Sequence, residues 1–143
     1  MSYSSDVSPV GWYIATYQLR FVELADNRKE DPERRFTTWE NTVLVKARNL
    51  REAYRKVMKI GKGHTAPYKG GPDAVDVRWL FEGVVELLPV YEEIEDGAEI
   101  MWAEHTRALK NIRKLAKKVG EFGNRDPNKP LHATALRNAA RER

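Results

Sequence analysis

The glycine-rich segment from Gly61 to Asp73, GKGHTAPYKGGPD, carries residue types suited to a small anionic ligand. Its glycines let the backbone approach a ligand closely. The side chains offer two positive charges, a ring that stacks on a base and a titratable nitrogen; the residues are Lys62, Lys69, Tyr68 and His64. The segment lacks the Gly-Lys-Ser/Thr sequence of a phosphate-binding loop, and it follows a predicted helix C-terminus, whose dipole disfavours phosphate. A long connection to an edge strand explains the same composition, so both interpretations stay open.

A second group of candidate binding residues is basic and lies in TRALKNIRKLAKKVGEF, residues 106–122. Its apolar residues recur at helical spacing, and its positive side chains suit a phosphate backbone. The candidate nucleic-acid-binding residues are Lys110, Arg113, Lys114, Lys117 and Lys118. No sequence signature of a nucleic-acid-binding fold accompanies them, and a solvated helix face opposite an apolar stripe accounts for them equally.

The remaining residue types predict no enzyme activity. The histidines at 64, 105 and 132 share no metal-ligand spacing, and there are no cysteines for a thiolate site. No pair of carboxylates is marked as acid and base. We therefore expect no catalytic residue, no metal and no cofactor.

Charge and composition limit the possible partners. The net charge of +4 divides unevenly: residues 1–105 hold 14 basic and 18 acidic residues (−4), and residues 106–143 hold 11 and 3 (+8). This asymmetry suits an anionic partner, or it neutralises the acidic part of the same chain or of another copy. The N-terminal residues lack the features of a signal peptide, and no apolar run approaches the roughly 20 residues of a membrane span. We expect a cytoplasmic protein with no membrane partner.

The pattern of the chain predicts an α+β fold. Strands are expected at Trp12–Val22, Phe36–Ala47, residues 74–88 and Ala98–His105. A helix begins after Asn49, where Glu52 completes a capping box, and ends at Gly61 or Gly63. A second helix follows within residues 106–122. The order β-β-α-β-β-α favours a four-stranded, mainly antiparallel sheet with packed helices and a basic C-terminal extension. We expect one domain over residues 1–123, followed by a basic tail or short helix over 124–143.

Short aromatic and glycine motifs punctuate these elements. They are WYIA in the first strand, Trp39-Glu40 in the second, EAY in the helix, WLFEGVVEL in the third strand and DGAEIMW at residues 96–102. In these motifs the chain resembles a bacterial family catalogued as a domain of unknown function, number 4288, over about residues 11–103. The resemblance implies a compact bacterial α+β domain and no activity for any residue.

The third strand raises the question of what covers the sheet. Alternation places Trp79, Phe81, Val85 and Leu87 on the face toward the first helix. The opposite face then holds apolar residues that need a second cover; these candidate interface residues are Ile14, Leu80 and Val84. The second helix, curling of the sheet around its own side chains, or a second copy of the chain could supply this cover. Because soluble proteins seldom leave large apolar patches wet and the second helix can cover only part of one face, we predict a non-enzymatic binding domain that forms a homo-oligomer through the sheet. Nucleic acid and an anionic small molecule are the alternative partners.

Overall fold

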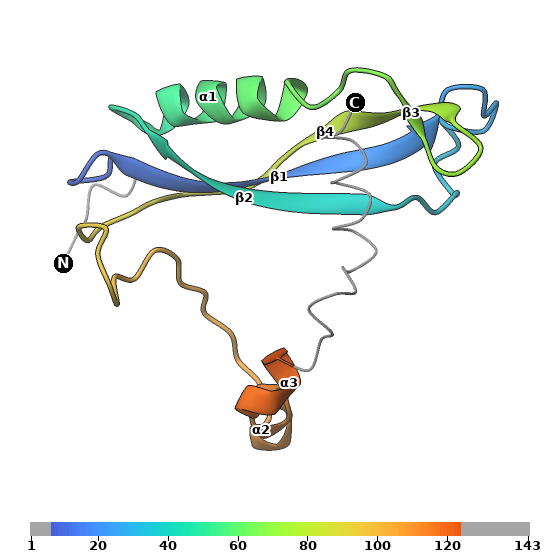
Figure 1. The fold of residues 1–143 in the computed structure, drawn as a ribbon. Helices are drawn as coiled ribbons and strands as arrows, with labels where there is room; N and C mark the ends of the chain where they lie inside the picture. The colour runs from blue at the N-terminus through green and yellow to red at the C-terminus, as the bar shows by residue number, and fades with distance from the viewer. Residues whose placement is uncertain (1–6, 124–143) are drawn as a thin grey trace. The chain divides into compact units, whose positions relative to one another are not determined.

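The structure is a computed structural model that describes residues 7–123 of the chain. Its four strands form one antiparallel sheet in the order β2-β1-β4-β3, and α1 lies along one face (Figure 1). The elements are β1 (Trp12–Glu23), β2 (Thr38–Lys46), α1 (Leu50–Lys62), β3 (Tyr68–Gly70), β4 (Val75–Pro89), α2 (Leu109–Leu115) and α3 (Val119–Gly123). This confirms the predicted α+β class and the four-stranded antiparallel sheet.

The central strand β1 supplies much of the core. Its β-branched and aromatic residues favour a strand, and alternate side chains point to the same face. The side chains beneath α1 are almost fully buried; they are Tyr13, Ala15, Tyr17 and Leu19. Strand β2 pairs with β1 in one unbroken register from Trp12 opposite Lys46 to Arg20 opposite Thr38.

Helix α1 forms as its capping box and apolar stripe predict. The Asn49 side chain accepts a hydrogen bond from the Glu52 N–H at 2.8 Å, which satisfies one of the free amides of the first turn. Ala53, Val57 and Gly61 form the buried face. The helix runs to Lys62 and ends at Gly63, which confirms one of the two predicted ends.

Strand β4 is interrupted by a bulge, and this changes which residues reach the core. The register with β1 shifts on both sides of Tyr17, and Gly83 adopts a φ of +101°. As a result Val84 lies opposite Tyr17 and packs against the core, while Val85 is 48% exposed. The predicted faces of these two valines were wrong, because a bulge adds residues to one strand and strict alternation fails across it.

The fourth strand of the sheet is β3, from within the glycine-rich segment. Its three residues pair with Val75–Val77 across a turn in which the Ala74 N–H donates to the Gly71 carbonyl. The sequence predicts a ligand loop or a long connection here, and β3 was not among the expected strands. Gly70 fits because an added Cβ would lie 2.7 Å from Val77 Cγ2, so a larger residue would disturb the pairing.

The predicted strand Ala98–His105 is absent: this segment forms no strand in the structure. A turn precedes it, with Gly97 at a φ of +85° and the Ala98 N–H bonded to the Glu95 carbonyl. Strand-like residues after this turn do not make a strand without a partner edge.

The predicted second helix is divided into α2 and α3. Ala116 has an extended conformation with a ψ of +132°, which ends α2. The side chain of Glu121 then accepts the N–H of Lys118 at 2.6 Å, at the start of α3. No residue of either helix is buried, and such short helices gain little stability without packing.

The chain groups into two compact units, one ending at Met101 and the other beginning at Trp102. Composition had favoured a boundary after residue 123. The predicted basic tail, residues 124–143, lies outside the described residues. Among the helices of residues 7–123, none combines the length and the apolar character needed to cross a membrane.

Candidate functional site

The glycine-rich segment does not gather its four candidate residues around one cavity. Lys62 is exposed in the last turn of α1. The ring of His64 stacks on the ring of Tyr17, with centroids 6.1 Å apart and planes 16° apart. Tyr68 is half-buried and packs against the core beneath α1. Lys69 forms an ion pair with Asp76, with Nζ 2.5 Å from Oδ1.

These positions limit the side chains that the segment can offer to a ligand. His64 stacks on Tyr17, Tyr68 packs against the core, and the charge of Lys69 is balanced by the facing residue of β4. Lys62 alone keeps its charge without an ion pair among the described residues. Binding of an anionic ligand here stays a prediction.

The basic residues around α2 are exposed, but they do not form one helical stripe. Lys110, Arg113 and Lys114 belong to α2, whereas Lys117 and Lys118 lie in the connection to α3. A hollow of about 500 Å³ beside α2 is lined in part by Arg107 and Lys114. The positive charge is therefore available to solvent, without the regular spacing expected from a continuous helix.

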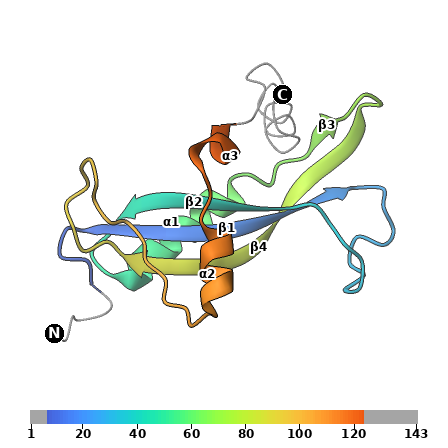
Figure 2. The ribbon, with the colours of Figure 1, turned by 90° about the horizontal axis from the view of Figure 1, so that it is seen from below.

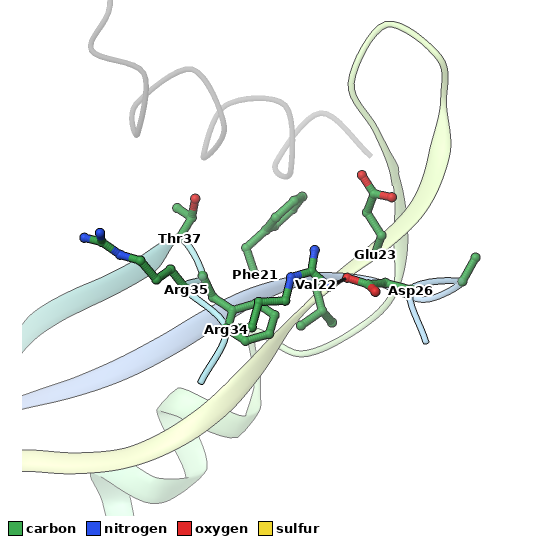
Figure 3. Close-up of a pocket in the computed structure, with 9 residues that line it drawn as sticks. Phe21, Val22, Glu23, Asp26, Arg34, Arg35 and Thr37 are labelled. Atoms are coloured by element: carbon green, nitrogen blue, oxygen red, sulfur yellow. Dashed lines mark hydrogen bonds and ion pairs between the residues drawn. The ribbon is translucent and has the colours of Figure 1, made fainter. Parts of the chain in front are cut away.

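A pocket of about 440 Å³ lies at the end of the β1–β2 hairpin (Figure 3). Its lining includes Phe21 and Val22, which project to opposite sides of β1 in Figure 3. The pocket therefore extends around the end of the hairpin and is not confined to one face of the sheet. Arg34 at its edge forms an ion pair with Asp26, which leaves Arg35 as the exposed cation of the lining.

The loop between β1 and β2 is organised by two aspartates. The Asp26 carboxylate accepts the N–H of Arg28, and the Asp31 carboxylate accepts the N–H of Glu33. The Arg28 N–H, and then the guanidinium of Arg34, lower the pKa of Asp26 below its ordinary value. The carboxylates thus replace the backbone partners that an irregular loop lacks.

This loop also covers one end of the sheet face opposite α1. Arg20 projects from β1 on that face and is held there, with its side chain only 13% exposed. Its Nη1 donates to the Lys29 carbonyl at 2.5 Å, its Nε lies 3.4 Å from Glu82, and its guanidinium lies 4.7 Å from the centre of the Phe36 ring. Val22 beside it is 3% exposed.

The other end of this face carries an apolar row across three strands. Ile14 lies opposite Leu44 of β2 and opposite Leu88 of β4. Ile14 is buried, Leu88 is half-buried and Leu44 is 41% exposed. The ammonium of Lys46 sits 5.7 Å from the centre of the Trp12 ring at the margin of this row. We call the residues Ile14, Leu44 and Leu88 the open-face row.

The predicted interface residues divide accordingly. Ile14 belongs to the open-face row, and Leu80, opposite Arg20, lies near the end covered by the loop. Val84 belongs to the core beneath α1. Sequence reasoning missed the role of Arg20 and the loop; the signal was a lone arginine within an apolar strand, followed by a segment rich in both charges.

Comparison with known proteins places this sheet in a family. A family model described as a domain of unknown function, DUF4288, matches residues 12–102. The chain belongs to the DUF4288 family. Searches of curated proteins and of solved structures find no match. The DUF4288 match covers the whole sheet and α1, and it ends before the basic residues of α2.

The DUF4288 domain shows no gathered metal ligands: within residues 7–123 no group of three or more His, Asp or Glu side chains is placed to hold an ion. The open-face row lies within residues 12–102, the part of the chain that matches the family. It places apolar side chains beside the charged residues Glu40 and Lys46 of β2.

Proposed function

We propose that this DUF4288 domain is a non-enzymatic interaction domain that self-associates through its sheet. The carrying observation is the two-sided character of the sheet. One face is covered by α1, and the other keeps the open-face row beside a loop that covers only the far end. Full burial of a large aliphatic side chain contributes roughly 1.5–3 kcal/mol. Ile14 is already buried, so association gains part of this from covering the exposed surface of Leu44 and Leu88.

The charges around the row suit a second copy of the same chain. On the same face as Ile14 and Leu44, β2 carries both Glu40 and Lys46. A surface with both signs of charge can match itself in a symmetric pair, where each patch meets its own copy. A partner with a single sign of charge would leave one of these side chains opposite a like charge.

The test compares two substitutions at equal exposure. Leu44→Glu places a charge within the open-face row, and Val75→Glu places the same charge at the start of β4; both parent residues are 41% exposed. We expect the wild type to sediment as an oligomer at micromolar concentration, Leu44→Glu to shift it toward monomer, and Val75→Glu to leave it unchanged. A wild type that stays monomeric throughout would reject the proposal.

A second candidate function is nucleic-acid binding by the basic residues of α2 and its C-terminal connection. It is favoured by the exposure of Lys110, Arg113, Lys114 and their neighbours and by the absence of an ion pair to any of them within residues 7–123. Titration with nucleic acid at different salt concentrations tests it. Because this segment lies outside the family match, the two candidates are independent.

A further inference from the structure

The outer edge of β2 has no strand partner among the described residues, and one backbone group on it, the Lys46 carbonyl, accepts from Lys56. β2 lies at one margin of the sheet, with no described strand beyond it (Figure 2). The Ala47 N–H donates to the Gly11 carbonyl, and the Thr37 carbonyl accepts the Phe21 N–H, so the odd-numbered residues bond to β1. In an antiparallel ladder the intervening residues direct their backbone groups the other way. Those residues are Thr38, Glu40, Thr42, Leu44 and Lys46.

The two margins of the sheet differ in how they discourage pairing. At the opposite margin, β3 pairs with only the first three residues of β4, and the remainder of β4 is bent by the bulge at Gly83. Bulges and short edge strands are the usual protection against pairing with another chain. β2 has neither: its nine residues keep one register with β1, without a proline or a bulge. Within residues 7–123, its outer edge is protected by the contact from the ammonium of Lys56 to the Lys46 carbonyl and by the charged side chains of Glu40 and Lys46.

The charges on β2 define one register for a partner strand. Glu40 and Lys46 are its two charged residues, both exposed and both on the face opposite α1. Val43 lies midway between them. If two copies of β2 pair antiparallel with Val43 opposite Val43, Glu40 of each copy faces Lys46 of the other. Thr42 then faces Leu44, and both use outward-directed backbone groups. Any other antiparallel register separates Glu40 from Lys46.

We infer that a second copy of this chain binds along the outer edge of β2, in antiparallel register about Val43, and joins the two sheets into one. The inference rests on the proposed self-association and specifies its geometry. The symmetry axis runs through the sheet, so both α1 helices lie on the same side. The open-face rows continue across the junction, because Leu44 packs beside Thr42 of the partner. Two cross-strand ion pairs fix the register.

The test reverses each charge separately and then mixes the two variants. In Glu40→Lys, like charges face each other twice in a homodimer, and the same is true of Lys46→Glu. We expect each variant alone to raise the dimer dissociation constant by about tenfold. In a mixture every opposed pair is again of opposite sign, so heterodimers should form at near wild-type affinity. Native mass spectrometry with one variant isotopically labelled measures the heterodimer fraction. Glu33→Lys, in the exposed loop, is the matched control.

A backbone variant gives a second readout. Thr42→Pro removes an outward N–H that β1 does not use, so the sheet should persist by circular dichroism while the dimer is lost. The outcomes separate the two proposals. A monomeric wild type rejects self-association itself. A dimer in which the mixed variants show no preference for each other, or which Thr42→Pro leaves intact, rejects pairing along β2 and leaves self-association through another part of the sheet.

Discussion

At the scale of single residues, Gly61 serves packing. Gly61 lies on the buried face of α1, where an added Cβ would overlap the ring of Phe81 and lie 3.2 Å from Cδ2 of Tyr17. The helix can therefore approach the sheet closely enough for these rings to meet, with centroids 6.2 Å apart. The sequence marks Gly61 as a possible helix end, and only the fold reveals its contact with the aromatic residues.

Gly61→Ala should destabilise the domain although alanine favours a helix. The new methyl group requires the Phe81 and Tyr17 rings to move, and such overpacking costs about 1–3 kcal/mol. Gly120→Ala is the control, because a Cβ there meets nothing within 4 Å. Chemical denaturation measures the free energy of unfolding of both variants. A Gly61→Ala protein as stable as the wild type would show that the rings adjust freely.

At the scale of elements, the β1–β2 loop shows how carboxylates can order a segment that has no apolar periodicity. Asp26 and Asp31 each accept a backbone N–H two residues later, and their pKa values are lowered mainly by these bonds. The loop then presents the Lys29 carbonyl to Arg20. Its order rests on ionised carboxylates, so it should respond to pH.

We expect the loop to lose its contribution to stability in acid. Because the folded pKa of Asp26 lies below the unfolded value of about 3.9, its ionised form stabilises the fold fully above that value. The contribution falls as the pH drops through the lower, folded pKa. Denaturation of the wild type and of Asp26→Asn from neutral to acidic pH measures this. The two curves should converge in acid, and parallel curves would contradict the role of Asp26.

Elements also show where sequence reasoning succeeds and fails. Asn49 and Glu52 predict the start of α1 correctly because a capping box is a local signal. The predicted position of Leu80 on the face away from α1 is correct. The same prediction for Val84 is wrong, because the bulge between the two residues depends on pairing with β1. β3 was missed because three residues next to glycines become a strand only when β4 supplies an edge.

At the scale of the whole molecule, part of the basic excess in the C-terminal quarter of the sequence forms an exposed basic segment around α2. The five candidate residues around α2 suit nucleic acid, and their count sets the salt dependence. If all five neutralise phosphates, affinity for duplex DNA should fall by about two to three orders of magnitude between about 50 and 200 mM salt. Fluorescence anisotropy with labelled DNA and RNA measures it.

The control for this titration uses lysines of similar charge elsewhere. Replacing Lys110, Lys114 and Lys117 with glutamine should weaken binding and reduce its salt dependence. Replacing Lys59 and Lys62 at the end of α1 with glutamine should change the affinity and its salt dependence little. Equal losses in both sets would indicate a general effect of net charge, and no binding even at low salt would remove this function.

The chain order of the sheet has a consequence for folding. The two neighbours of β1 are β2, which follows after a loop, and β4, which ends at Pro89. During synthesis, residues 12–62 can form the β1–β2 hairpin and α1 while the second edge of β1 still has no partner. Contacts between distant segments close slowly. We therefore expect the nascent chain to remain aggregation-prone until β4 has left the ribosome, and the pairing of β1 with β4 to limit the folding rate.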